Sequence, residues 1–61
     1  MNIVTVENQG VWSATLENIV GAKAAQSSTE KEAIFEVIKD NLTIIGSMPD
    51  TTVIKVNGVI L

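Results

Sequence analysis

The order of apolar and polar residues predicts a β-hairpin at the start of the chain. Residues 2–7 contain four β-branched side chains in a row, a composition typical of strands. Residues 11–16 alternate between side chains that face the core and side chains that face solvent. The core-facing set is Trp12, Ala14 and Leu16, and the outward set is Val11, Ser13 and Thr15. Gly10 ends the segment between the two strands and can adopt the positive φ of a short hairpin with a bulge.

A loop and a weaker strand are predicted to follow. Residues 17–21 break the alternation and end in a glycine, which indicates a loop. Residues 22–26 are predicted as a third strand, mainly because of their position between the hairpin and a helix, since their side chains are small.

The strongest local signal predicts one helix that begins after Thr29. Thr29 is a good N-cap and Glu32 has the capping-box spacing, so the Thr29 hydroxyl accepts from the Glu32 N–H and the Glu32 carboxylate accepts from the Thr29 N–H. Apolar residues then recur at steps of three and four, which is typical of a helix packed on a core. This stripe consists of Ile34, Val37, Ile38, Leu42 and Ile45. Gly46 and Pro49 are expected to end the helix.

The last part of the chain is predicted to add one strand and an apolar tail. Residues 52–56 have the composition of a strand, and Asn57-Gly58 is a type I′ hairpin signal. Residues 59–61 are too few for an independent strand and need to be covered by the core or by another chain. We expect association through the edge of the last strand or through this tail. The candidate interface residues are Val53, Ile54, Val56, Val59, Ile60 and Leu61.

These elements predict a single α+β domain over residues 1–61. Its order is β-β-β-α-β, with a three- to four-stranded antiparallel sheet packed on one helix. A domain of this size buries only about 60% of the surface of its unfolded chain, and the sequence has no Cys for a disulfide. Because 46% of the residues are hydrophobic, we expect the chain to be stabilised by association into a homo-oligomer.

The charges restrict the partners. The chain has seven Asp and Glu residues, four Lys and no Arg, which gives a net charge of −3. Nucleic acids are bound mainly through Lys and Arg, so direct nucleic-acid binding is not expected. An acidic surface either fits a basic protein partner or only keeps the protein in solution. No apolar run exceeds three residues, far below the roughly 20 of a membrane-spanning helix, and no signal peptide is recognisable, so we expect a cytoplasmic protein.

Carboxylates are the only catalytic material in the sequence, which has no His and no Cys. Glu32, Glu36 and Asp40 recur every four residues and share one face of the helix. They form either a metal or acid–base cluster or a solvated helix face, and the second interpretation is favoured because no activating base lies nearby. The hydroxyls of residues 27–29 lack a His to activate them. No catalytic, cofactor-binding or metal-binding residue is therefore predicted.

Residues 10–33 carry a set of motifs at defined spacing. Gly10-Val11-Trp12 opens a strand, and Gly21 lies nine residues after Trp12. Residues 27–33 match the helix start Gly-Asp-Thr-x-x-Glu-Ala at its Thr, Glu and Ala, with two serines in place of Gly-Asp. With these motifs the chain resembles the HicB-like antitoxin domain, a small partial RNase H fold. Both prolines of the family's loop are replaced, by Glu17 and Val20.

The resemblance implies a function as an antitoxin that binds and occludes a small basic RNA-cleaving toxin of the HicA type. Full-length antitoxins of this kind usually carry a second, DNA-binding domain, which is not expected within these 61 residues. Two alternatives stay open. One is a small module that assembles only with itself, and the other is a degenerate metal-dependent hydrolase that uses the three helix carboxylates.

Overall fold

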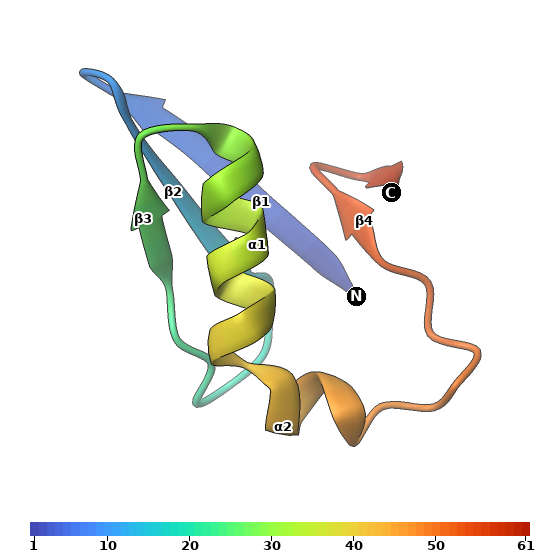
Figure 1. Cartoon of the computed structure of the whole chain (residues 1–61). Helices are drawn as coiled ribbons and strands as arrows, with labels where there is room; N and C mark the ends of the chain where they lie inside the picture. Colours follow the sequence, from blue (N-terminus) through green and yellow to red (C-terminus); the bar gives the residue numbers. More distant parts are fainter.

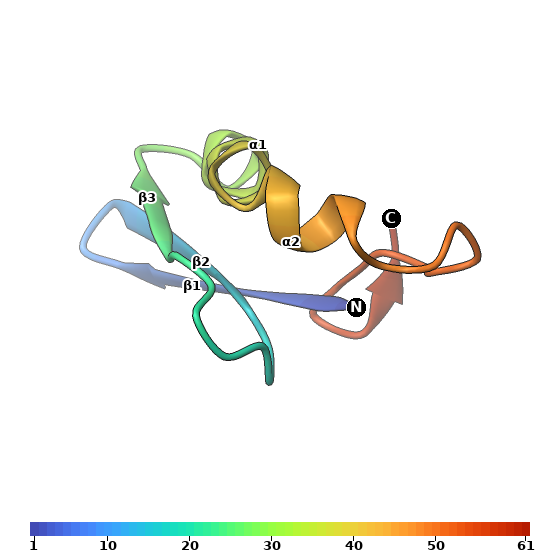
Figure 2. The same cartoon turned by 90° about the horizontal axis from the view of Figure 1, so that it is seen from below.

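A computed structural model describes all residues from Met1 to Leu61. The chain forms a small α+β fold with a five-stranded mixed sheet of order β3-β2-β1-β4-β5 and two helices. The elements are β1 (Asn2–Asn8), β2 (Val11–Leu16), β3 (Ala25–Ser27), α1 (Glu30–Asp40), α2 (Leu42–Gly46), β4 (Lys55–Val56) and β5 (Val59–Ile60). Helix α1 covers one face of the β1–β3 part of the sheet (Figure 1), and the other face carries no helix (Figure 2). The α+β prediction is confirmed.

The predicted N-terminal hairpin is present, with a tighter turn than expected. The pairing of β1 with β2 runs without interruption from Ile3 and Leu16 to Asn8 and Val11. The bulge that we predicted is therefore wrong. Gln9 and Gly10 form the whole turn with φ values of 53° and 82°, the backbone signature of a type I′ turn.

The third strand begins later than predicted, at Ala25 instead of residue 22. The backbone of Lys23 is occupied elsewhere, because its N–H and its C=O both bond to the side chain of Asn41, at 2.8 and 2.9 Å. The strand therefore pairs with β2 only between Ala25 and Ser27.

The expectation of a purely antiparallel sheet is wrong. β4 pairs with β1 in parallel, with Ile3 opposite Val56. The chain leaves β3, crosses the sheet through α1 and returns on the far side of β1, and such a crossover is what parallel neighbours require. The last predicted strand is also shorter, since only Lys55 and Val56 of residues 52–56 pair.

Residues 59–61 do supply a strand, contrary to the prediction. Val59 and Ile60 form β5, which pairs antiparallel with β4. The turn residues between them, Asn57 and Gly58, have φ values of 51° and 83°, as the type I′ signal predicted. Two residues suffice because this turn places them directly beside a partner strand.

The single predicted helix is divided into two at Asn41. Helix α1 ends at Asp40 and α2 begins at Leu42, and Asn41 between them has non-helical dihedral angles. Val37 is buried as the stripe predicted, but Leu42 is 60% exposed. The helix instead buries Ala33, Val37 and Asn41, four residues apart on one face.

The core is small and lies entirely in the first two thirds of the chain. Seven of the 61 residues are buried, and three of these are alanines. The buried residues are Ile3, Ala14, Leu16, Ala25, Ala33, Val37 and Asn41. Trp12 is half-buried against them. Only Ile3 and Val37 are large side chains that are completely enclosed. Neither helix is long and apolar enough to cross a lipid bilayer.

Candidate protein-interaction surface

The edge of the sheet at β5 is the most apolar exposed segment of the chain. Val59, Ile60 and Leu61 are each 69–70% exposed, and no strand lies beyond β5. The Leu61 N–H donates to the Ile54 carbonyl at 2.9 Å. Because hydrogen-bonded and non-bonded pairs alternate in an antiparallel ladder, the N–H and C=O of Ile60 point away from β4. This edge therefore presents apolar side chains together with free backbone groups, which is the arrangement that accepts a further strand.

The side chain of Asn57 fixes the β4–β5 hairpin to the rest of the sheet. Its Oδ1 accepts from the Thr5 N–H at 2.9 Å, and its Nδ2 donates to the Thr5 hydroxyl at 2.7 Å. The Asn57 N–H also donates to the Ile3 carbonyl at 2.8 Å. The amide group thus extends the parallel β1–β4 ladder beyond the last paired backbone residue.

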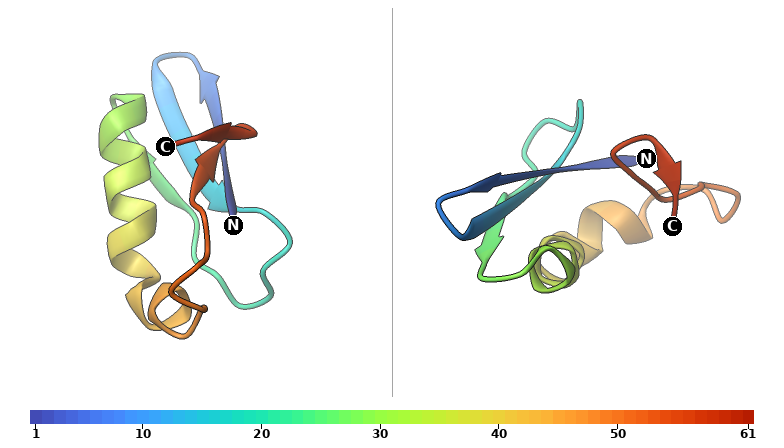
Figure 3. Two further views of the ribbon diagram at one scale, coloured as in Figure 1. Left: turned by 90° about the vertical axis from the view of Figure 1, so that its right-hand side faces the viewer. Right: turned by 90° about the horizontal axis from the view of Figure 1, so that it is seen from above.

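Further polar contacts connect this hairpin to β1 and α1. The Gly58 N–H donates to Asn2 Oδ1 at 2.9 Å. The Thr5 hydroxyl, which accepts from Asn57, donates to Glu30 Oε2 at 2.7 Å. The network ties the first turn of α1 to the β4–β5 turn by way of β1, which lies between α1 and this turn in the left view of Figure 3.

The other candidate interface residues divide between the surface and the core. Val53 is 48% exposed, and its carbonyl accepts from the amino group of Met1 at 2.8 Å. Ile54 and Val56 are half-buried and pack against the core cluster. The strand that we expected to be an edge, β4, has β1 on one side and β5 on the other, so β5 provides the edge in its place.

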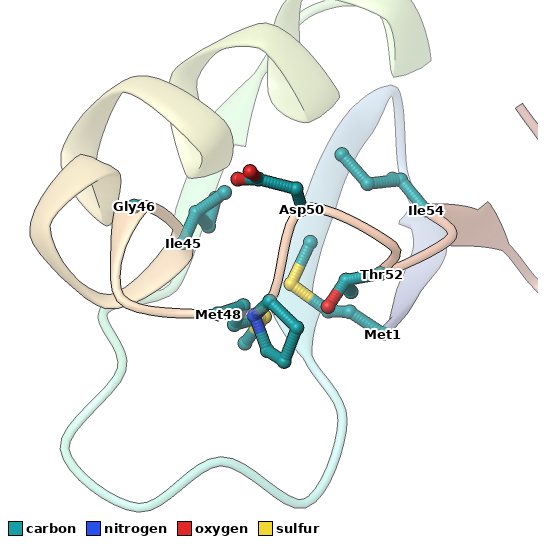
Figure 4. A pocket seen from close by; sticks show the side chains of 8 residues that line it. Met1, Ile45, Gly46, Met48, Asp50, Thr52 and Ile54 are labelled. Atoms are coloured by element: carbon teal, nitrogen blue, oxygen red, sulfur yellow. The ribbon is translucent and has the colours of Figure 1, made fainter.

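A cavity lies between Met1, α2 and the segment that leads to β4 (Figure 4). Its lining includes both methionines of the chain, Met1 and Met48, together with Ile45 and Ile54. Its volume of about 170 Å³ is below the roughly 300–1,000 Å³ typical of small-molecule sites. The contacts around it position the segment that precedes β4.

The helix cap forms only half of the predicted capping box. Thr29 Oγ1 accepts from the Glu32 N–H at 3.2 Å, and Thr29 has the extended dihedral angles of an N-cap. The Glu32 carboxylate does not return to the Thr29 N–H. Its Oε2 accepts from the Ser27 hydroxyl at 2.8 Å instead, which joins the end of β3 to the start of the helix.

The three helix carboxylates are not gathered around a common point. Glu36 forms an ion pair with Lys39 at 3.0 Å, and Glu32 is bonded to Ser27. No group of three residues among the Asp and Glu side chains is arranged to hold a metal ion. Helix α1 carries four of the seven acidic residues of the chain, which are Glu30, Glu32, Glu36 and Asp40.

Asn41 is the structural residue that the sequence analysis missed. It is 3% exposed, and its Nδ2 donates to the carbonyls of Val37 and Lys23 at 2.7 and 2.9 Å. Its Oδ1 accepts from the Lys23 N–H at 2.8 Å. Asn41 follows Val37 by four residues and therefore lies on the same, buried face of the helix. This spacing indicates that the Asn41 side chain is buried and needs hydrogen-bond partners.

Comparisons of the chain with models of protein families, with curated proteins and with solved structures give no match.

Proposed function

We propose that this chain is a non-catalytic interaction protein that associates with other chains by strand addition at β5. The observation that carries this proposal is the β5 edge, where three apolar side chains at 69–70% exposure accompany the outward backbone groups of Ile60. An added antiparallel strand satisfies these groups and covers the apolar side chains at the same time. The small core adds support, since a domain with few buried residues gains stability from a partner.

A second copy of the chain is the first partner that this edge fits. Two β5 edges brought together antiparallel form a continuous sheet with twofold symmetry. Each copy then covers the apolar side chains of the other. None of Val59, Ile60 or Leu61 carries a charge on its side chain, so these three residues bring no like-charged side chains together at this contact.

The resemblance to the HicB-like domain supports a further partner, a small basic RNA-cleaving protein that the chain binds and occludes. The resemblance implies the order β-β-β-α-β, and the observed order before β5 is β-β-β-α-α-β, which differs from it by the short helix α2. The acidic residues of α1 provide charge complementarity, which steers the encounter with a basic partner more than it adds to affinity. The alternative to such a partner is a module that assembles only with itself, through the same β5 edge.

The self-association is tested by light scattering on the wild-type chain and on Ile60→Lys, over a range of concentrations. A lysine at a sheet edge opposes the addition of a strand, so Ile60→Lys is expected to raise the dissociation constant at this contact at least tenfold. Phe35→Lys is the matched control, because Phe35 is 63% exposed on α1. A wild-type chain that is monomeric at all concentrations, or equal association in both variants, contradicts strand addition at β5.

The partner is tested by recovering the tagged chain from its native cells. A small basic protein at fixed stoichiometry, whose RNA cleavage the purified chain inhibits, is the expected result. Recovery of the chain as a homo-oligomer alone contradicts the antitoxin function and supports the self-assembling module. Binding of magnesium or manganese below millimolar concentration, lost in Glu36→Gln, would support the hydrolase alternative instead.

A further inference from the structure

The β4–β5 turn contains the one place in the chain where a glycine follows an asparagine, Asn57-Gly58. Asparagine is a chemically labile residue, because the backbone nitrogen of the next residue can attack its side-chain carbonyl carbon. A side chain on that next residue hinders the attack, and glycine has none. The other four asparagines precede isoleucine, glutamine or leucine, and they are Asn2, Asn8, Asn18 and Asn41.

The reaction at such a step is a cyclisation followed by hydrolysis. The Gly58 nitrogen forms a bond to Asn57 Cγ, the Cγ–Nδ2 bond breaks, and the Gly58 N–H proton leaves with Nδ2 as ammonia. One water molecule then opens the resulting cyclic imide. Cleavage of its bond between nitrogen and Cγ gives aspartate, and cleavage of its bond between nitrogen and the Asn57 backbone carbonyl carbon gives isoaspartate. Both residues are exposed, so solvent supplies the water.

The folded hairpin engages both reacting groups in other bonds. The Gly58 N–H donates to Asn2 Oδ1 at 2.9 Å. The Asn57 amide is bonded to Thr5 through Oδ1 and Nδ2, at 2.9 and 2.7 Å. These bonds must break before the Asn57 side chain can turn toward a free Gly58 nitrogen. Strands β4 and β5 have only two residues each, and such short segments with little buried surface open locally. The reaction is therefore expected from the opened hairpin.

The product is expected to fit the closed hairpin less well than asparagine does. The Thr5 hydroxyl accepts from Asn57 Nδ2 and donates its single proton to Glu30 Oε2 at 2.7 Å. A carboxylate at position 57 only accepts hydrogen bonds, so it competes with Glu30 for that proton and repels the Glu30 carboxylate. Aspartate tolerates the positive φ of this position as asparagine does, so the loss lies in the side-chain network. Isoaspartate adds a carbon to the main chain and so also distorts the two-residue turn.

We propose that Asn57-Gly58 is a site of spontaneous deamidation that reacts only when the β4–β5 hairpin opens, and that the modification weakens the closure of this hairpin on β1. The bonds to Thr5 and Asn2 protect the site while the hairpin is closed. The proposal concerns a single chain and does not depend on association. Because the hairpin carries β5, the modified chain also loses its ordered edge strand, and only the effect of that loss on a partner rests on the proposed function.

The first test measures the rate of modification in the full chain at neutral pH. Peptide mapping by mass spectrometry gives the fraction of aspartate and isoaspartate at position 57 over time. The rate is expected to be about tenfold or more higher in the chain unfolded by guanidinium chloride than in the folded chain. In the folded chain, Thr5→Val removes the acceptor of Asn57 Nδ2 and is expected to raise the rate about threefold or more.

The matched control is Thr15→Val, the same change at an exposed position of β2, which is expected to leave the rate unchanged. Equal rates in the folded and unfolded chain, equal effects of the two substitutions, or products spread evenly over the asparagines overturn the proposal.

The second test measures the effect of the product on the hairpin. Asn57→Asp reproduces the aspartate form and is expected to accelerate, by about tenfold, the hydrogen exchange of the Lys55 N–H, which donates to the Met1 carbonyl in β1–β4 pairing. Adding Glu30→Gln is expected to restore most of the protection. The new amide then donates to the Thr5 hydroxyl, whose own proton becomes free for the carboxylate at position 57.

The control for this rescue is Glu30→Gln added to Asn57→Gly, where no carboxylate is present at position 57 and no restoration is expected. Exchange in β2 that stays slow shows that each variant is folded. Unchanged Lys55 exchange in Asn57→Asp, or equal effects of Glu30→Gln in the two backgrounds, contradict the proposed effect of the modification.

Discussion

The two parts of this chain are held in place by different forces. All seven buried residues lie between Ile3 and Asn41, and none lies in residues 42–61. The first part forms a sheet packed on α1, whereas the second part adds α2, a loop and two short strands along β1. Fully enclosed apolar side chains therefore stabilise only the first part. The second part is held by hydrogen bonds to β1 and by the half-buried Ile45, Ile54 and Val56, which pack against the core.

The two parts differ in how deeply their apolar side chains are buried. In the first part, Ile3 and Val37 are fully enclosed. In the second part, Val59, Ile60 and Leu61 are as apolar but more than two thirds exposed. Full burial of such side chains is worth about 1.5–3 kcal/mol each, and the single chain does not gain it at these three positions. The second part is thus the part that we expect to associate.

The largest expected effect is a difference in the free energy of unfolding between substitutions at two isoleucines, Ile3 and Ile60. Ile3→Ala removes a fully enclosed side chain and is expected to lower the free energy of unfolding by about 2–5 kcal/mol, measured by urea unfolding followed by circular dichroism. Ile60→Ala at low concentration is expected to change it by no more than about 0.5 kcal/mol. Equal losses in the two variants would contradict the division of the chain into a part with fully enclosed apolar side chains and a part without them.

The next effect is expected at the boundary between the two parts. Asn41→Ala leaves the Lys23 N–H and the carbonyls of Lys23 and Val37 without their partner. Unsatisfied buried groups cost about 1–3 kcal/mol, so the unfolding midpoint in urea is expected to fall accordingly. Leu42→Ala, one residue further on and exposed, serves as the control. A loss at Leu42 as large as that at Asn41 would argue for one continuous apolar stripe.

A smaller and local effect is expected at the β4–β5 turn. Asn57→Gly keeps the positive φ of this position without strain and removes only the side chain that bonds to Thr5. Hydrogen exchange is expected to accelerate by about tenfold in Val56 and Leu61, since the net worth of such bonds is about 0.5–1.5 kcal/mol each. Exchange in β2 is expected to stay unchanged. Unaltered exchange in β4 and β5 would show that the hairpin does not depend on Asn57.

The smallest effect is expected at the helix cap. Thr29→Ala removes the acceptor of the Glu32 N–H and is expected to cost about 1 kcal/mol, measured by thermal unfolding. Ser28→Ala, at the neighbouring exposed position, is the matched control. If both substitutions have the same effect, the Thr29 cap does not contribute to the stability of α1.

Local patterns predicted the N-terminal hairpin and the start of α1, but they misplaced the start of β3 and the end of the helix. The alternation around Trp12, Ala14 and Leu16 and the cap at Thr29 depend on neighbouring residues alone. The Asn57-Gly58 turn was predictable for the same reason. The β1–β4 pairing was not predicted, because parallel pairing depends on the path of the chain across α1, which no local pattern contains.

The errors in the helix end, the start of β3 and the β1–β4 pairing arise because single polar side chains bond to residues that are distant in the sequence. Asn41 divides the helix and delays β3 because it bonds to Lys23, 18 residues away in the sequence. Asn57 extends the β1–β4 ladder through Thr5, 52 residues away. Apolar composition predicted a candidate interface at Val53, Ile54, Val56, Val59, Ile60 and Leu61. The placement of Val59 and Ile60 on the outer strand of the sheet depends on these long-range bonds.

The central claim is that β5 is an open edge which a second chain covers, and the amide of Ile60 reports on it directly. We expect its hydrogen exchange, followed by NMR, to be fast in dilute protein and to slow in proportion to the population of dimer as the concentration rises. The mass from light scattering on the same samples gives that population. Exchange at Ile60 that stays fast at every concentration, while the mass increases, would contradict strand addition at β5.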